Sequence, residues 1–262
     1  MSEPILLDLD AAGVATVTLN RPDIHNAFDE TLIADLTKTF EAVGTDSKVR
    51  VVVLAGAGKS FSAGADIKWM RRMAEYSRAE NVRDAEALAN MLRTLNDIPK
   101  PTLAVVQGAA IGGGVGLVAC CDIAIAAEDA VFSLSEVRLG LIPATIGPYV
   151  LAAIGARQAR RYFLTAERFS AKDALRIGLV HEVVLAAELP EARARQVDGL
   201  LKNGPRAMGE AKALIRDVAG RPIEHGLIKE TAERIANIRA SEEGKEGLSA
   251  FLEKRPARWV KS

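Results

Sequence analysis

The sequence predicts an α/β fold, in which buried strands and helices alternate along one chain. Residues 49–56 and 99–108 are short, continuous apolar runs, which are typical of strands covered on both faces in a parallel sheet. A glycine-rich loop and a helical pattern follow each run. From about Asn203 onward the sequence predicts helices almost throughout, so we expect a core of residues 1–202 and a helical region of residues 203–262.

The N-terminal third predicts a hairpin, a helix, a strand and a long helical region. Apolar and polar residues alternate in Ile5–Leu9 and Val14–Leu19, on either side of a turn, which predicts the β-hairpin. A helix is expected from about Asp29 to Val43. Its apolar residues recur at helical spacing, at Leu32, Ile33, Leu36 and Phe40. After the strand at residues 49–56, the charged stretch Ile67–Leu95 predicts one long helical region.

The rest of the core predicts shorter elements. Residues 109–122 read as a glycine-rich turn that runs into an apolar helix, and residues 123–133 as two short strands. Residues 134–155 combine a short helix, a turn and a second helix. Ser170 is expected to cap a helix that Gly178 ends, because serine is a preferred N-cap residue and glycine a preferred C-cap residue.

Composition excludes several classes of protein. Lys plus Arg and Asp plus Glu number 34 each, so the net charge is zero and gives no electrostatic reason to expect a nucleic-acid or membrane partner. The two cysteines are adjacent, at Cys120 and Cys121, and form no disulfide framework. The first ten residues lack the basic segment of a signal peptide, and no run reaches the ~18 apolar residues of a membrane span. We therefore expect a soluble cytoplasmic protein.

The stretch Val53–Asp66 contains Gly58-Lys59-Ser60, which resembles the end of a phosphate-binding P-loop. The position that requires the first glycine of that motif is occupied by Val53, and the residues after Ser60 are small and turn-like rather than helical. A second glycine run, Gly112–Gly114, does not fit the dinucleotide-binding pattern, because Leu117 stands at its final glycine position. Nucleotide binding is therefore disfavoured.

Two glycine-rich loops, residues 61–66 and 112–114, have another use. Small residues let a ligand approach the backbone, and N–H groups at a helix start carry partial positive charge. If the two loops meet, their N–H groups form paired donors, which is the layout of an oxyanion hole. Close packing of strand against helix explains either loop alone equally well.

Candidate acid–base residues are few. The histidines, at positions 25, 181 and 225, are far apart, and no metal-ligand spacing or Cys-x-x-Cys occurs, so no metal site is expected. Glu136 lies in an apolar stretch, where partial desolvation raises the pKa of a carboxyl group. The alternative is an exposed glutamate at a helix start, and spacing alone slightly favours that alternative.

Six ordered blocks of the chain resemble the enoyl-CoA hydratase/isomerase, or crotonase, family. They are "LNRPDIHNAF", "VVVLAGAGKSFSAGADIKWM", "PKPTLAVVQGAAIGGGVGL", "CDIAIAAEDAVFSLSEVRLGLIP", "LTAERFSAKDALRIGLVHEVV" and "EGLSAFLEKR". The resemblance implies the crotonase (ClpP-like) ββα superhelix with a helical C-terminal region, in trimers that often pair into hexamers. Within the family, the chain looks most like bacterial hydratases of the methylglutaconyl-CoA type, which act in leucine and isoprenoid breakdown.

The resemblance also implies roles for individual residues. The N–H groups of Ala65 and Gly113 would hold the thioester oxygen of an acyl-CoA. The adenine end of the substrate's coenzyme A would lie near Ala63, Asp66 and Ile67. Its phosphates would lie near Lys68 and Lys254. Lys254 is expected to act across a subunit boundary, although a plain surface role fits each lysine as well.

The chain departs from the family at one position that matters. Family hydratases commonly carry two glutamates, of which the second matches Glu136 and the first falls at Gly116. A glycine there is expected to enlarge the pocket and suit a branched or carboxylated acyl chain. Ala144, Thr145 and Ile146 replace the usual turn after the second glutamate, and Thr145 is expected to line the pocket.

The sequence hypothesis is therefore a hydratase of a branched or carboxylated enoyl-CoA, with Glu136 as general acid–base. Coenzyme A is part of that substrate, and no separate cofactor is expected. The alternatives are a Δ3,Δ2-enoyl-CoA isomerase with a single glutamate, which Gly116 motivates, and an acyl-CoA binder without catalysis. Arg138 is a weaker candidate partner for a distal carboxylate of the substrate.

Overall fold

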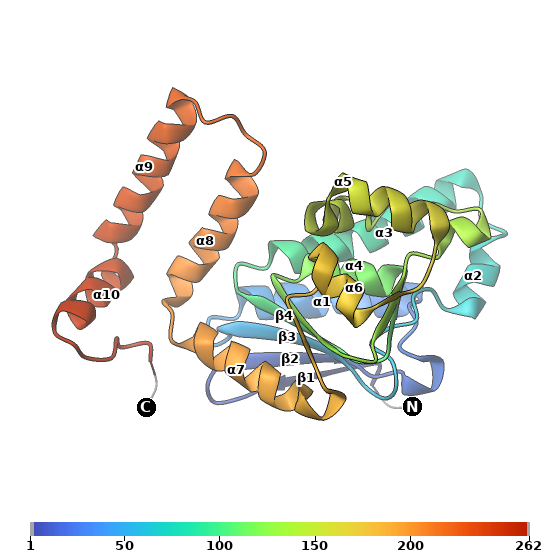
Figure 1. Cartoon of the computed structure of the whole chain (residues 1–262), viewed down its shortest axis with the longest axis horizontal. Coiled ribbons are helices and arrows are strands. Elements are labelled where there is room, and N and C mark those ends of the chain that lie inside the picture. The colour runs from blue at the N-terminus through green and yellow to red at the C-terminus, as the bar shows by residue number, and fades with distance from the viewer. Residues whose placement is uncertain (1–2, 261–262) are drawn as a thin grey trace.

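Two sheets form the centre of the protein, whose computed structural model describes residues 3–260 (Figure 1). The larger sheet has the order β1-β2-β3-β4-β6-β9, with β1 antiparallel to β2 and every other pair parallel. The smaller sheet has the order β5-β7-β8. The strands of the larger sheet are β1 (Ile5–Leu9), β2 (Val14–Leu19), β3 (Val51–Gly56), β4 (Thr102–Val106), β6 (Ile123–Ala127) and β9 (Glu182–Val184). Those of the smaller sheet are β5 (Ala109–Ile111), β7 (Val131–Ser133) and β8 (Phe169–Ser170).

Both faces of the larger sheet are covered by helices. The main helices of the core are α1 (Glu30–Thr45), α2 (Ile67–Met73), α3 (Arg78–Asp97), α4 (Gly113–Cys120), α5 (Gly147–Thr165), α6 (Ala171–Ile177) and α7 (Leu189–Leu201). Along β3, Val52 and Leu54 join the core cluster that includes residues of α1 and α3, whereas Val51 and Val53 join the cluster that includes residues of α7. The continuous apolar run therefore reflects a strand buried on both faces, as the sequence predicted.

Most local predictions are confirmed. The hairpin strands have the predicted bounds, and Asp29 caps α1 by accepting a hydrogen bond from Leu32 N at 2.8 Å. Ser170 caps α6, and Gly178 ends it with φ +86°, a conformation that glycine adopts without strain. No helix within residues 3–260 is long and apolar enough to cross a membrane.

The expectation of one long helical region over Ile67–Leu95 is wrong. The chain forms α2, turns, and starts again as α3 after Ser77. Ser77 Oγ accepts a hydrogen bond from Glu80 N, and Glu80 Oε2 accepts one from Ser77 N at 2.8 Å. This reciprocal capping box satisfies N–H groups that lack partners at a helix start. The Ser-x-x-Glu spacing in the sequence therefore indicated that a new helix begins here.

A helical arm extends to one side of the core (Figure 1). It consists of α8 (Pro205–Val218), α9 (His225–Ala240) and α10 (Glu242–Leu252), and the only residues of these helices that are buried are Leu227 and Ala250. Arg50 ties the base of the arm to the core by donating to the carbonyls of Leu201 and Trp259, both at 2.8 Å. The C-terminal region is helical as predicted, but within one chain it leaves most of its apolar surface uncovered.

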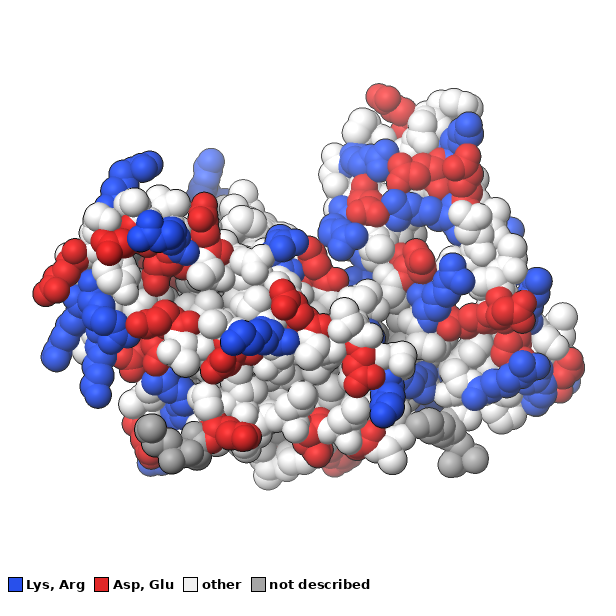
Figure 2. All heavy atoms as spheres, turned by 180° about the vertical axis from the view of Figure 1, so that it is seen from behind, with Lys and Arg blue, Asp and Glu red and all other residues white. Residues whose placement is uncertain are grey.

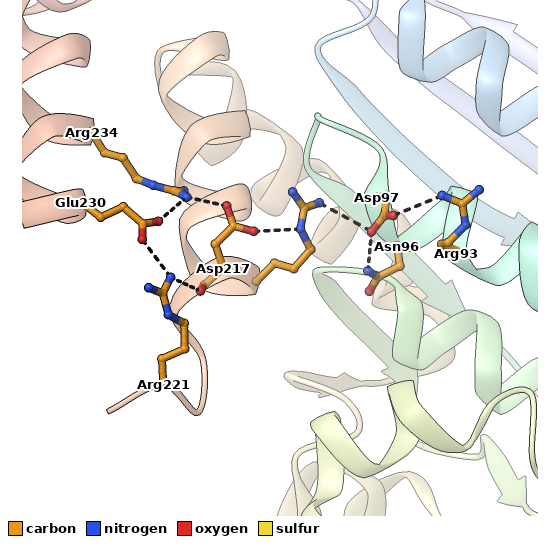
Figure 3. A network of polar contacts seen from close by, with 8 residues as sticks. Arg93, Asn96, Asp97, Asp217, Arg221, Glu230 and Arg234 are labelled. Atoms are coloured by element: carbon orange, nitrogen blue, oxygen red, sulfur yellow. Dashed lines mark hydrogen bonds and ion pairs between the residues drawn. The ribbon is translucent and has the colours of Figure 1, made fainter. Parts of the chain in front are cut away.

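Charged side chains connect α8 and α9 with α3 (Figure 3). Asp217 of α8 accepts a hydrogen bond from Arg234 of α9 at 2.7 Å and pairs with Arg216, which reaches Asp97 of α3 at 3.6 Å. Acidic and basic side chains are interspersed over the face seen in Figure 2, on the core and on the arm. Solvent-accessible pairs of this kind each stabilise a fold by roughly 0–1 kcal/mol, so this network adds little to the attachment of the arm.

Candidate active site

The first glycine-rich loop connects β3 to α2 and leaves one N–H group unused. Phe28 N donates to Gly64 O at 2.7 Å, and Asp66 N donates to Phe28 O at 2.7 Å. Ala65 lies between these two bonds and is exposed, and its own N–H donates to no group in residues 3–260. Asp66 caps α2 by accepting hydrogen bonds from Lys68 N and Trp69 N. The N–H of Ala65 is thus fixed in direction and available to a ligand.

The second loop begins helix α4. Gly112 has φ +52°, so only glycine fits there without strain, and its N–H donates to Ser133 O at 2.8 Å. Gly113 is the first residue of α4, and its N–H has no acceptor within the described chain. The first N–H groups of a helix lack intrahelical partners and carry partial positive charge. Gly113 N–H is therefore a second unused donor.

The two loops lie against each other. Ser62 N donates to Ala109 O at 3.0 Å, and Ile111 N donates to Ser62 O at 2.9 Å. A methyl group added at Gly64 would lie 2.8 Å from Ile111 O and 3.9 Å from Gly113 N. The glycines are needed because the two backbones approach this closely, and the approach brings the neighbourhoods of Ala65 and Gly113 together as the oxyanion-hole hypothesis requires.

Glu136 lies beside the second loop. It begins a short 3₁₀ helix, Glu136–Leu139, and a methyl group at Gly112 would lie 3.2 Å from its Oε1 atom. Its Oε2 atom is buried and has no hydrogen-bond partner in the described structure. Burial raises the pKa of Glu136. The alternative of an exposed glutamate at a helix start is therefore wrong, and the carboxyl group is suited to exchange protons with a ligand.

The space expected at Gly116 is filled. A methyl group at Gly116 would lie 2.3 Å from Ile146 Cγ2 and 3.5 Å from Leu92 Cδ2. Ile146 is 2% exposed and Leu92 is fully buried. The expectation that Gly116 enlarges the pocket is therefore wrong, because the side chain of Ile146 occupies the volume that a residue-116 side chain would take.

The other residues to which the resemblance assigns roles lie on several separate elements. Ala63 belongs to the first loop, and its N–H donates to His25 O at 2.9 Å. Ile67 and Lys68 are exposed at the start of α2, and Thr145 is half-buried next to Ile146. Lys254 is exposed beyond α10, in the arm, which Figure 1 shows far from α2. One chain therefore does not bring Lys254 to Lys68.

Two residues that shape the site were missed by sequence reasoning. The side chain of Asn26 is fully buried and donates to the carbonyls of Ala57, Ser60 and Phe61 at 2.8–3.2 Å, which pins the first loop. Phe28 binds the same loop through its backbone. Both lie in the block "HNAF", which the resemblance marked without assigning a role. The only local signal was Asn26 itself, since asparagine tolerates the positive φ, here +56°, that this turn adopts.

Comparison with known proteins identifies the family to which this chain is similar. The enoyl-CoA hydratase/isomerase family matches residues 10–262. A crotonyl-CoA hydratase of Syntrophomonas wolfei is 34% identical, over 98% of this chain and 98% of that protein. An (E)-benzylidenesuccinyl-CoA hydratase of Thauera aromatica is 35% identical, over 96% of this chain and 97% of that protein.

A solved structure extends the comparison to the fold. An enoyl-CoA hydratase from Shewanella pealeana is 46% identical and superposes with a TM-score of 0.95, over 98% of this chain and 96% of that one. The predicted crotonase fold with a helical C-terminal region is therefore confirmed. On sequence and fold together, the chain belongs to the enoyl-CoA hydratase/isomerase family.

Proposed function

We propose that this protein is an enoyl-CoA hydratase, a lyase that adds water across the α,β double bond of an acyl-CoA. The observation that carries the proposal is the buried, unpartnered carboxyl oxygen of Glu136 beside two loops with unused N–H groups. This combination supplies an acid–base group and paired donors for a developing oxyanion. The relatives that are named hydratases of crotonyl-CoA and short-chain enoyl-CoA support the same reaction.

The proposed reaction uses only the protein's own groups and the substrate. The N–H groups of Ala65 and Gly113 hold the thioester oxygen. The Glu136 carboxylate removes a proton from water, whose oxygen bonds to the β-carbon, and the electrons of the double bond move to the thioester oxygen as an enolate. The protonated Glu136 then gives a proton to the α-carbon, which restores the carbonyl and the carboxylate. Each donor of such an oxyanion hole is typically worth roughly 10²–10³ in rate.

For the acyl group, we propose a branched or carboxylated chain of the methylglutaconyl-CoA type. Ile146 fills the space beside Gly116, so an enlarged pocket at Gly116 no longer supports this choice. What supports it is the sequence resemblance and the relative named for a benzylidenesuccinyl thioester, an acyl group with its own carboxylate. Arg138, exposed two residues after Glu136, is the proposed partner of the distal carboxylate.

The second candidate is an enoyl-CoA isomerase, and one observation favours it. Residue 116 is a glycine and Ile146 fills the space beside it, so the site has no second carboxyl group at that position to help hold water. A single carboxylate suffices to move a proton between two carbons of an acyl chain, which is the isomerase reaction.

One assay separates these functions. The purified protein is given crotonyl-CoA, 3-methylglutaconyl-CoA and a 3-enoyl-CoA, and the absorbance of the conjugated enoyl thioester is followed. We expect the absorbance to fall with a conjugated substrate and mass spectrometry to show the hydroxyacyl product. A rise from the 3-enoyl substrate alone would make the protein an isomerase, and binding without any reaction would make it an acyl-CoA binder.

We also propose that the arm docks on neighbouring subunits in a trimer or a hexamer. Phe251 and Leu252 at the end of α10 are 80% and 77% exposed, an unusual state for large apolar side chains. The same docking would carry Lys254 to the coenzyme A bound by a neighbour. Light scattering is expected to give a mass of three or six chains of 28.0 kDa. Phe251→Glu is expected to lower that mass, and a monomeric native protein would contradict the proposal.

A further inference from the structure

We propose that Phe28 is a positioning residue that sets the spacing between the Ala65 and Gly113 N–H groups. The inference rests on the proposed function, since it assumes that these two groups hold a thioester oxygen together. The side chain and the peptide groups of this one residue connect two loops that follow different strands. Phe28 has no polar side-chain atom and is almost completely buried, so its side chain supplies no acid, base or hydrogen-bond donor to the reaction.

The backbone of Phe28 fixes the first donor. Its N–H donates to Gly64 O and its carbonyl accepts from Asp66 N, both at 2.7 Å. These bonds flank Ala65 on both sides and form a parallel bridge between Phe28 and Ala65. Because C=O and N–H point to opposite sides of a trans peptide, the bond to Gly64 O directs Ala65 N–H away from Phe28.

The ring of Phe28 fixes the second donor. A methyl group at Gly113 would lie 2.5 Å from Phe28 Cε2 and 3.0 Å from Cδ2, so the ring edge lies against the first residue of α4. Phe28 is 1% exposed and belongs to the main core cluster, so the ring has no room to turn away. Contacts this close transmit a displacement, because protein interiors are packed as densely as organic crystals.

The segment that carries Phe28 is itself anchored. Asn26 spans the start of the first loop with its buried amide, and Ser62 Oγ donates to Asn26 O at 2.9 Å while accepting from Gly64 N at 3.2 Å. Arg21 donates to Ala27 O at 3.0 Å and pairs with Asp29 at 2.7 Å. The residues on both sides of Phe28 in the sequence are thus held by hydrogen bonds and an ion pair. Phe28 therefore keeps a fixed position between the two loops.

The spacing matters because two donors must reach one oxygen atom at the same time. Catalytic groups need to be placed within about 0.5 Å of their productive position, and a misplacement of 1 Å costs about 10²-fold in rate. If α4 moves toward the space left by a smaller side chain, Gly113 N–H moves with it. Ala65 N–H does not move, because the main-chain atoms of residue 28 hold it, and these atoms are the same whichever side chain residue 28 carries.

The test compares Phe28→Leu with Phe40→Leu. Both phenylalanines are buried to within 1% of complete burial in the same core cluster. Phe40 lies in α1, and its atoms are not among the nearest neighbours of the glycines in either loop. We expect the two variants to lose similar thermal stability. We expect Phe28→Leu to lower kcat about 10–100-fold with a smaller change in KM, and Phe40→Leu to keep kcat within about twofold.

A second readout does not depend on turnover. Butyryl-CoA with a ¹³C thioester carbonyl is saturated and cannot be hydrated, and its carbonyl stretch moves to lower frequency when an oxyanion hole polarises it. The shift is expected in the wild-type protein and in Phe40→Leu, and it is expected to shrink in Phe28→Leu. A purely structural role for Phe28 would lower stability without changing this shift.

A double-mutant cycle tests the contact itself. Gly113→Ala keeps the N–H group but places a methyl group against the Phe28 ring, so we expect lower kcat. Adding Phe28→Leu makes room for the methyl group, and the double variant is expected to be more active than the product of the single effects allows. Strict additivity would contradict direct contact between the two residues.

The outcomes separate this proposal from the proposed function. If the wild type hydrates substrate and polarises the carbonyl, but Phe28→Leu matches Phe40→Leu in both readouts, then Phe28 is only a core residue. If the wild type polarises the carbonyl without hydrating any substrate, the proposed reaction is wrong and the spacing role still stands or falls on the infrared shift. If the wild type shows no shift with bound butyryl-CoA, there is no oxyanion hole and both proposals are overturned.

Discussion

Glu136→Gln is expected to lower kcat for enoyl-CoA hydration by about 10²–10⁴-fold, the usual contribution of a general acid–base group. The amide has nearly the shape of the carboxyl group but neither accepts nor donates a proton at neutral pH. The buried Oε2 position has no protein partner whose hydrogen bond would be lost. The loss should therefore appear in kcat, while binding of an acyl-CoA stays nearly unchanged.

The matched control is Glu128→Gln. Glu128 is an exposed glutamate between β6 and β7, so its neutralisation changes the net charge equally without touching the site. It should keep wild-type kcat. If Glu136→Gln retains full activity on every acyl-CoA that the wild type converts, Glu136 is not the acid–base group.

The raised pKa of Glu136 gives this prediction a pH signature. The proposed base is the carboxylate, so kcat/KM should fall as the pH drops through the pKa of Glu136 in the free enzyme. Burial raises that pKa, and the acidic limb should therefore lie above the ordinary pKa of a glutamate carboxyl group. A pH–rate profile checks this, and a limb at or below the ordinary value would contradict a buried base.

The same shift predicts the sign of the effect on stability. A carboxyl group whose pKa is raised by folding stabilises the native state fully below its unfolded pKa. This contribution is lost as the pH rises through the folded pKa. Partial burial disfavours the charged form of the Glu136 carboxyl group, whereas glutamine stays neutral at every pH. Thermal unfolding at pH 8 should therefore show Glu136→Gln to be at least as stable as the wild type.

Gly116→Glu is expected to destabilise the protein rather than restore a second carboxylate. The first carbon of the new side chain would lie 2.3 Å from Ile146 Cγ2. Overpacking of a filled core costs typically about 1–3 kcal/mol, and an added buried charge costs more. For a protein of this size each kcal/mol lowers Tm by about 2–4 °C. Gly199→Glu in α7 is the control, because a methyl group there meets no atom within 4 Å.

Ile146→Ala tests whether the clash is the cause. Removing the isoleucine costs about 2–5 kcal/mol by itself, because it opens a cavity. In that background, Gly116→Glu should cost less than it does alone, with a coupling of about 0.5–3 kcal/mol. The combined variant should also have a higher ratio of hydratase to isomerase activity than Ile146→Ala alone. Equal costs in both backgrounds would show that Ile146 is not the obstacle.

The sequence by itself determined the local elements and the types of residue in the loops. Alternation predicted β1 and β2, continuous apolar runs predicted β3 and β4, and a serine and a glycine marked the ends of α6. These features follow from contacts within a few residues, which explains why a pattern reveals them. The capping box at Ser77 was equally local and was missed only because the charged helical pattern continues past it.

The tertiary structure alone decided how the candidate site is built. Glu136 has the sequence context of an exposed helix start, yet its Oε2 atom is buried beside Gly112, which comes from another part of the chain. The space at Gly116 depends on Ile146, thirty residues later, and the spacing of the two donors depends on Phe28, far before Gly113. Packing and desolvation arise from residues that meet only after folding, so no local pattern encodes them.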